Sequence, residues 1–166
     1  MEQNIVKILA ISDVPSKLLW DESVRKRLEG IDLILSCGDL PKKYLEYLTN
    51  FTTAPILYVH GNHDGSYKES EPGGCICVDD AVYIWKGLRI MGLGGCNRYN
   101  RDDTFQYTEA EMRWRVRKLW LAARRAGGID ILLTHAPASG LNDGTDRKST
   151  RLNSSHKTES RMPSSA

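Results

Sequence analysis

Short hydrophobic runs recur along the chain, and four of them end at a residue type that can bind a metal ion. These runs, rich in Ile, Leu and Val, cover residues 8–13, 33–39, 56–64 and 131–135. Runs of this kind are typical of buried parallel strands, and parallel sheets bind their ligands at the carboxyl ends of the strands. The pattern therefore predicts five polar side chains at one sheet edge: Asp13, Asp39, Asn62, His63 and His135.

Between the first three runs, the sequence predicts two helices that cross back over the sheet. One covers residues 17–28 and is ended by Gly30, and Pro41 begins the other, which runs to about residue 50. Proline is well tolerated in the first turn of a helix, because its missing N–H would have no helical partner there. Strands that alternate with helices in this way indicate an α/β fold.

The middle third of the chain predicts an antiparallel meander. Three β-rich runs, at residues 75–78, 82–85 and 88–91, are separated by Asp79-Asp80 and by Lys86-Gly87. Both dipeptides are typical of tight turns between antiparallel strands. We therefore expect the three runs to pair with one another.

A third helix is predicted to begin after Thr108, which has capping-box spacing to Glu111, and to end near Gly127-Gly128. Its apolar face is formed by Met112, Val116, Leu119, Trp120 and Ala123. Its opposite face is basic, with Arg113, Arg117, Lys118, Arg124 and Arg125. A charged outer face is ordinary for an amphipathic helix, and neither aromatic interleaving nor a recognised motif points to nucleic acid. We therefore do not expect a nucleic-acid partner.

The ordered motifs of the chain resemble those of the calcineurin-like metallophosphoesterases. They stand as Ser12-Asp13, Gly38-Asp39, Gly61-Asn62-His63-Asp64 and Thr134-His135-Ala136-Pro137. The resemblance implies a layered β-sandwich flanked by helices, spanning residues 1–145 and incomplete at the C-terminus. It also implies a phosphoester substrate and two divalent metal ions, for which the oxygen and imidazole ligands suit Mn, Fe or Zn.

The resemblance assigns a role to each of five residues. Asp39 bridges the two ions, Asp13 binds the first ion, and Asn62 and His135 bind the second. His63 is not a ligand, and instead it faces the leaving-group oxygen, where it donates a proton or stabilises charge.

Each residue also has an ordinary structural interpretation. Asp13 and Asp39 are candidates for helix caps after strands, and His135 is a candidate for orienting a loop. His60, which precedes the Gly-Asn-His-Asp motif, is interpreted as structural. Arg98 is a candidate for binding a substrate phosphate through both guanidinium nitrogens, with a surface role as the alternative.

Two departures from the family pattern concern the metal ligands. The family usually has a histidine two residues after the first aspartate, where this chain has Pro15, and it has a later Gly-His-x-His motif that does not occur here. Each absent ligand leaves a coordination position to water, which lowers the affinity for the ion. The chain is therefore expected to bind metal weakly and to hydrolyse phosphoesters slowly or not at all.

Residues 146–166 resemble the translation of a short-read sequencing adapter, in two blocks that share one reading frame. We predict that they form a disordered, artefactual tail; a native Ser/Lys/Arg-rich tail is the alternative. Since the whole chain carries +2 and this segment carries +3, residues 1–145 carry −1. The basic isoelectric point therefore gives no support for nucleic-acid or membrane binding by the domain. No run is long enough to span a bilayer and the start does not resemble a signal peptide, so a cytoplasmic location is expected.

These observations favour one function and leave two alternatives open. The favoured function is a metal-dependent phosphoesterase that hydrolyses a phosphomonoester or phosphodiester with a metal-activated water, weakened or inactive in this truncated form. The first alternative is a noncatalytic relative that binds a phosphorylated ligand or a partner with the same fold. The second is a nucleic-acid-binding domain that uses the basic helix. The sequence does not predict an oligomeric state.

Overall fold

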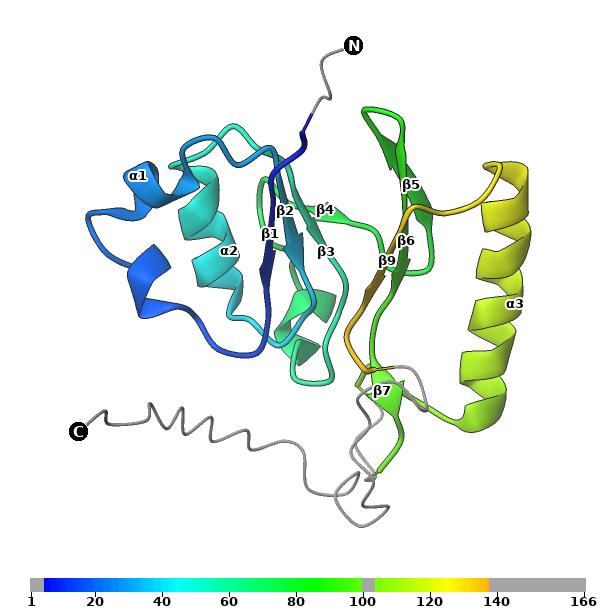
Figure 1. The fold of residues 1–166 in the computed structure, drawn as a ribbon. Helices are drawn as coiled ribbons and strands as arrows, with labels where there is room; N and C mark the ends of the chain where they lie inside the picture. The colour runs from blue at the N-terminus through cyan, green and yellow to red at the C-terminus, as the bar shows by residue number, and fades with distance from the viewer. Residues whose placement is uncertain (1–4, 100–103, 138–166) are drawn as a thin grey trace, which may run out of the picture. The chain divides into compact units, whose positions relative to one another are not determined.

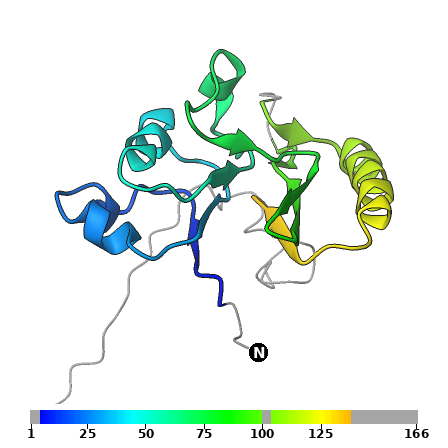
Figure 2. The same cartoon turned by 90° about the horizontal axis from the view of Figure 1, so that it is seen from above.

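The computed structural model describes residues 5–99 and 104–137 of the chain. Two β-sheets lie face to face and helices cover their outer faces, so the layers follow the order helix, sheet, sheet, helix (Figure 1; Figure 2). The layered α/β fold predicted from the sequence is therefore confirmed.

The first sheet is parallel throughout, with the strand order β1, β2, β3, β4. Its strands are β1 (Ile8–Ile11), β2 (Leu33–Ser36), β3 (Ile56–Tyr58) and β4 (Ile76–Cys77). Every residue of β2 and β3 is buried, as expected for central strands covered on both faces. Neighbouring residues of β2 face different cores: Ile34 packs among the helices, whereas Leu33 and Leu35 pack between the two sheets.

The helices on the first sheet include one that is shorter than predicted. These elements are η1 (Lys17–Leu19), α1 (Val24–Leu28), α2 (Lys42–Thr49) and η2 (Gly65–Lys68). α2 follows Pro41 as expected, but a single helix over residues 17–28 is wrong. The helix is interrupted at Asp21, whose Oδ1 accepts hydrogen bonds from the Ser23 amide (2.8 Å) and hydroxyl (2.5 Å). Such local bonds compete with the helical backbone bonds.

The second sheet has the strand order β5, β6, β9. Its strands are β5 (Val82–Trp85), β6 (Leu88–Leu93) and β9 (Ile131–Thr134), and the short strands β7 (Cys96–Asn97) and β8 (Gln106–Tyr107) pair separately. β5 and β6 form the predicted hairpin. Lys86 and Gly87 both have positive φ, 46° and 86°, as a two-residue turn of type I′ requires.

Two predictions about strand pairing are wrong. β9 pairs in parallel with β6 instead of joining the sheet of β1 to β3, so His135 approaches from the opposite sheet. The run at residues 75–78 does not join the meander, because β4 pairs in parallel with β3. Asp79 and Asp80 mark a crossing between the sheets, and their carboxylates bind Arg115 instead of closing a hairpin turn.

α3 (Glu109–Arg125) lies on the outer face of the second sheet (Figure 1). The predicted capping box is present: the Thr108 hydroxyl accepts from the Glu111 amide (3.3 Å), and the Glu111 carboxylate accepts from the Thr108 amide (2.7 Å). These bonds satisfy two N–H groups that have no partner within the helix. The helix therefore begins where the sequence predicts.

The buried face of α3 differs from the predicted one. Arg115 and Leu119 are buried, whereas Val116 and Trp120 are 44% and 54% exposed. Arg115 turns inward because it pairs with the two aspartates at the crossing between the sheets. The predicted face is therefore partly wrong, since a buried arginine takes a position that apolar spacing alone does not reveal.

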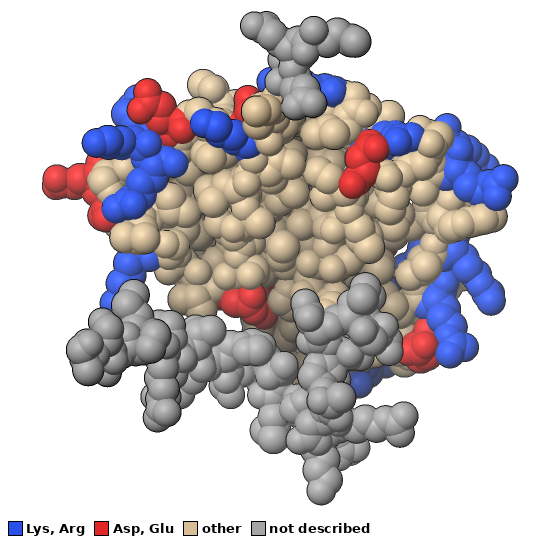
Figure 3. Space-filling model, in the orientation of Figure 1, with Lys and Arg blue, Asp and Glu red and all other residues tan. Residues whose placement is uncertain are grey.

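The basic side chains of α3 other than Arg115 reach solvent, and Lys and Arg gather on the side of the molecule that α3 forms (Figure 3). Contrary to the expectation from sequence, aromatic rings lie among them. The Lys118 ammonium is 3.8 Å from the ring centroid of Trp114, and the Arg124 guanidinium is 4.9 Å from that of Trp120. Aromatic interleaving is therefore present on this face.

Candidate metal and phosphoester site

The first two motif aspartates have an unusual backbone conformation. Asp13, after β1, has a φ of 60°, and Asp39, after β2, has a φ of 58°. Residues other than glycine rarely adopt positive φ, and such strained positions cluster at functional sites. The Asp13 amide donates to the Gly38 carbonyl at 3.1 Å, which links the two loops. The loops are therefore built to hold both aspartates in defined positions.

The interpretation of these aspartates as helix caps is wrong. The N-cap residues of η1, α1 and α2 are Ser16, Ser23 and Pro41. Neither Asp13 nor Asp39 occupies a capping position, so their conformation is not explained by helix initiation.

Two motif glycines allow the loops after β2 and β3 to touch. A Cβ atom on Gly38 would lie 2.4 Å from the Gly61 backbone nitrogen, and a Cβ atom on Gly61 would lie 2.0 Å from Asp39 Oδ1. Contacts this short do not occur for real Cβ atoms. Gly38 also has a φ of 93°, and this conformation by itself favours glycine. The Gly-Asp and Gly-Asn-His-Asp motifs therefore need their glycines because the loops pack against each other.

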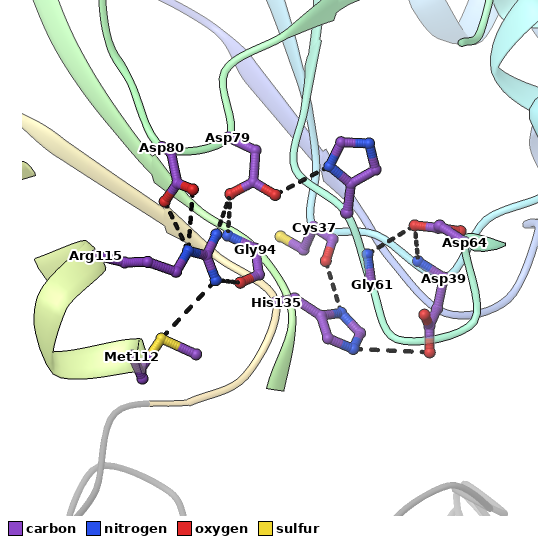
Figure 4. Close-up of polar contacts among 11 residues, drawn as sticks. Cys37, Asp39, Gly61, Asp64, Asp79, Asp80, Gly94, Met112, Arg115 and His135 are labelled. Atoms are coloured by element: carbon purple, nitrogen blue, oxygen red, sulfur yellow. Dashed lines mark hydrogen bonds and ion pairs between the residues drawn. The ribbon is translucent and has the colours of Figure 1, made fainter. Parts of the chain in front are cut away.

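Asp64 ties the same two loops together and is almost fully buried. Its Oδ2 accepts from the backbone amides of Gly61 (2.7 Å) and Asp39 (2.9 Å) (Figure 4). Burial raises the pKa of the Asp64 carboxyl, although both amide hydrogen bonds favour its charged form. No role for Asp64 was predicted from the sequence, although its place as the last residue of the Gly-Asn-His-Asp motif is a usable signal.

The side chains of Asp39, Asn62 and His135 converge. His135 Nε2 lies 3.1 Å from Asn62 Oδ1 and 3.7 Å from Asp39 Oδ2. His135 Nδ1 is 2.8 Å from the carbonyl oxygen of Cys37, to which it donates (Figure 4). In the neutral imidazole this leaves a lone pair on Nε2 that faces two oxygen atoms. An oxygen of Asp39 and an oxygen of Asn62, both from loops of the first sheet, therefore lie near one ring nitrogen of His135 from the second sheet.

This donor set fits a divalent cation. The lone pair of Nε2 repels the lone pairs of both oxygens unless a cation, or a proton on Nε2, lies between them. A carboxylate, an amide oxygen and an imidazole whose other nitrogen is fixed by a carbonyl are characteristic of transition-metal ligands. Among residues 5–99 and 104–137, no group of three or more His, Cys, Asp and Glu side chains is placed to hold an ion. The group of Asp39, Asn62 and His135 contains only two such residues, because its third donor is the amide of Asn62.

The other predicted residues surround this point. The His63 side chain is 58% exposed, and its Nε2 lies 3.9 Å from Asp39 Oδ2. The His63 amide donates to Asp39 Oδ1 at 2.8 Å, so one carboxylate oxygen is held by the backbone while the other faces His135. Asp13 is exposed beside the same loops, with Pro15 two residues further on.

Arg98 and its neighbour Tyr99 lie at the end of β7. The Arg98 guanidinium is 3.3 Å from the Gln106 carbonyl oxygen and 3.5 Å from the Glu111 carboxylate, so its predicted contact with substrate stays a prediction. The Tyr99 hydroxyl accepts from the Asn62 side-chain amide at 3.0 Å, which leaves the amide oxygen for His135. Tyr99 could not be predicted from the sequence, because nothing in its local pattern places it beside Asn62.

His60 has the structural role that the sequence suggested. Its Nδ1 lies 2.9 Å from Asp79 Oδ2, and its ring stacks on Phe105 with a centroid separation of 4.1 Å. Asp79 in turn binds Arg115 at 2.9 Å. The role of Arg115 could not be predicted from the sequence, because its partners Asp79 and Asp80 lie about 35 residues away along the chain.

Comparison with models of known protein families gives a match that covers most of the chain. Residues 6–161 match the family described as the calcineurin-like phosphoesterase superfamily domain. No curated protein matches the chain. Within the part of the chain that the structure describes, no helix is both long and apolar enough to cross a membrane.

Proposed function

Because the chain belongs to the calcineurin-like phosphoesterase superfamily, we propose that it hydrolyses a phosphomonoester or phosphodiester with the help of two divalent metal ions, drawn from Mn, Fe and Zn. The observation that carries this proposal is that His135 Nε2 lies 3.1 Å from Asn62 Oδ1 and 3.7 Å from Asp39 Oδ2. These three residues would hold one ion, and Asp13 and Asp39 would hold the other. When bound, such ions neutralise phosphoryl oxygens and lower the pKa of a water molecule.

The residues of the chain itself have separate tasks in this proposal. Asp39 is held through one oxygen by the His63 amide, so its second oxygen keeps a fixed direction. The exposed His63 side chain stands beside that carboxylate and is free to meet a substrate. An imidazole in this place donates a proton to the leaving-group oxygen, which avoids the release of an unstable alkoxide. His63 is therefore the proposed catalytic acid.

Pro15 and the absent Gly-His-x-His motif are the reasons to propose that this activity is weak in the present chain. By its family resemblance, position 15 supplies a histidine ligand to the ion that Asp13 binds, and proline has no donor atom to replace it. A Pro15→His variant should therefore bind Mn²⁺ more tightly and hydrolyse a model phosphoester faster than the parent chain. Asp39→Asn should abolish whatever activity is present, whereas the exposed Glu22→Gln should not change it.

Hydrolysis assays with one model monoester and one model diester test the proposal directly. Activity that depends on Mn²⁺ and is lost in Asp39→Asn supports a phosphoesterase. If Pro15→His and the parent chain both stay at the background rate, the enzymatic assignment fails. Saturable binding of inorganic phosphate under the same conditions would then favour the noncatalytic, phospholigand-binding alternative.

The basic face of α3 supports a nucleic-acid-binding alternative more than the sequence suggested. Trp114 and Trp120 lie among its Lys and Arg side chains, and exposed aromatic rings beside cations can stack on bases. Such binding is strongly salt-dependent. Binding of single-stranded oligonucleotides that weakens steeply with salt and is lost in Trp114→Ala would favour this alternative over the phosphoesterase proposal.

We also propose that the functional domain covers residues 1–145 and that residues 146–166 have no role. The support is the resemblance of this segment to a translated adapter, although the family match extends to residue 161. The segment lies outside the described residues. Deletion of residues 146–166 should leave the melting temperature unchanged, and protection of this segment from hydrogen exchange would show that it is native.

A further inference from the structure

A buried cluster of charged groups lies behind the candidate metal site. Arg115 of α3 is only 5% exposed, and arginine is almost never buried without a partner. Its Nε donates to both carboxylate oxygens of Asp80 (2.8 and 3.0 Å), Nη2 donates to Asp79 Oδ1 (2.9 Å), and Nη1 donates to the Gly94 carbonyl (2.8 Å). Figure 4 shows the guanidinium reaching from α3 into the corner that these three residues form. The ring of Tyr107 lies 3.9 Å from it.

The cluster continues to the residue that precedes Gly61-Asn62. Asp79 Oδ2 is 2.9 Å from His60 Nδ1, and Asp79 Oδ1 accepts from the Gly94 amide at 2.6 Å. The Gly95 amide donates to the His60 carbonyl at 2.6 Å. A Cβ atom on Gly94 would lie 2.6 Å from that carbonyl oxygen, so the loop after β6 packs directly against the backbone of His60.

This contact matters because the candidate site draws its ligands from both sheets. Asn62 follows β3 of the first sheet, and His135 follows β9 of the second sheet. β9 pairs with β6, which ends just before Gly94. The 3.1 Å separation between His135 Nε2 and Asn62 Oδ1 therefore depends on how firmly the Gly94 loop holds the His60 segment.

We propose that Arg115 is a positioning residue that clamps the two sheets together behind the site and thereby sets the separation between Asn62 and His135. The proposal rests on the proposed function only in taking these two residues as metal ligands. The planar guanidinium binds Asp79 and the Gly94 carbonyl at the same time, which a lysine ammonium, with one nitrogen, cannot do in the same geometry. The side chain of Arg115 therefore matters for its shape as well as for its charge.

Asp80 offers a matched comparison with Asp79. The carboxylate of Asp80 is half exposed and binds the same guanidinium, whereas the carboxylate of Asp79 is buried and contacts both His60 and the Gly94 amide. If the link to His60 is what counts, loss of the Asp79 charge should disturb the site and loss of the Asp80 charge should not. A role in general stability alone would instead raise hydrogen exchange throughout both sheets and α3, and not selectively at the loop of Gly61 and His63.

The experiment compares the full chain with its Arg115→Met, Arg115→Lys, Asp79→Asn and Asp80→Asn variants. Hydrogen exchange is measured at the Gly61 and His63 amides, and Mn²⁺ affinity is measured by calorimetry. Mutation of a group just outside the ligand shell typically lowers metal affinity about 10- to 100-fold. We therefore expect Arg115→Met and Asp79→Asn to lower the affinity for Mn²⁺ about ten-fold. Exchange at the two amides should rise in both variants relative to the amides of β2. Arg115→Lys should fall between these variants and the parent chain, and Asp80→Asn should match the parent chain.

Unchanged exchange and affinity in Arg115→Met and Asp79→Asn would overturn the proposal. An equal rise in exchange across β2, β3 and α3 would do the same, because it would show a purely structural role. If Arg115→Met does not fold, Asp79→Asn and Arg115→Lys carry the same comparison. If the parent chain binds no Mn²⁺, the proposed function fails, but a selective rise in exchange at Gly61 and His63 still supports the clamp.

Discussion

The two sheets differ in how fully the described residues cover them. Every residue of β2 and β3 is buried, with helices on one side and the second sheet on the other. In the second sheet, by contrast, Ile84 of β5 and Leu132 of β9 are 60% and 50% exposed. An open apolar groove that includes Met91 and Trp120 also lies between this sheet and α3. The centre of the first sheet is thus covered on both faces, although its edge strand β1 is partly exposed, whereas the second sheet keeps more apolar surface open.

The candidate site takes residues from both sheets. Asp39 and Asn62 follow β2 and β3, the buried strands of the first sheet, and their loops are fixed by Gly61 and Asp64. His135 follows β9, on which Leu132 is half exposed. The fully buried strands of the first sheet therefore lead to most of the candidate ligands, and a half-exposed strand of the second sheet leads to the last one. Contacts between the sheets then decide whether the donors meet.

The largest effect on stability is expected at the contact between the sheets. Arg115→Met removes the cation that faces the buried Asp79 carboxylate. Breaking a buried ion pair by removing one partner typically costs about 3–5 kcal/mol, because the other charge stays buried and unpaired. Urea denaturation should show a loss of this size in the free energy of unfolding. Arg117→Met, on the exposed face of the same helix, should change it by less than about 0.5 kcal/mol.

A pair of leucine substitutions compares the two sheets directly. Leu57 of β3 is fully buried, so Leu57→Ala should lower the free energy of unfolding by about 2–5 kcal/mol. Leu132 of β9 is half exposed, so Leu132→Ala should cost less than about 1 kcal/mol. Equal losses in a chemical denaturation series would show that the second sheet is as well covered as the first.

Gly61→Ala tests whether the motif loops really touch. The added Cβ atom would lie 2.0 Å from Asp39 Oδ1 and 2.5 Å from the Asp39 amide, and the backbone cannot move without breaking the bonds to Asp64. Overpacking of this kind typically costs about 1–3 kcal/mol. Gly73→Ala, where the nearest atom is 3.4 Å away in a flexible glutamate, is the matched control. Thermal melting of both variants should separate them clearly, and similar melting temperatures would contradict the close packing.

The smallest effect concerns acid stability. Burial alone would raise the pKa of the Asp79 carboxyl, but the hydrogen bonds from His60 and the Gly94 amide and the charge of Arg115 outweigh it and lower the pKa below its ordinary value. A pKa that is depressed by folding adds stability above the pKa of the unfolded chain, and this stability is lost as the pH falls through the folded value. The free energy of unfolding should therefore fall with acidification below about pH 4, and less steeply in Asp79→Asn. Identical pH profiles of the parent chain and Asp79→Asn would show that Asp79 does not contribute to acid stability.

Much of the fold could be predicted from the sequence because local signals and tertiary packing agree. The apolar runs became β1, β2, β3 and β9, and Thr108 and Glu111 form the predicted capping box. Strand partners could not be predicted in the same way. The composition of residues 131–134 indicates a strand, but it does not say that β6 of the second sheet is its neighbour.

The residues of the candidate site could be predicted from the sequence, but the residues that hold them in place could not. Asp39, Asn62 and His135 were chosen from their positions after apolar runs, and the structure brings them together. The buried role of Arg115 depends on partners about 35 residues away, which no local pattern encodes. Tyr99 was missed for the same reason, because its contact with Asn62 spans 37 residues.

Calorimetric titration of Mn²⁺ or Zn²⁺ into the chain tests the central claim most directly, namely that Asp39, Asn62 and His135 form one cation site. We expect saturable binding that is weakened in Asn62→Ala and His135→Ala, because each change removes one of the converging donor atoms. The exposed Glu22→Gln should bind like the parent chain. Absence of binding by the parent chain, or unchanged affinity in His135→Ala, would contradict the account.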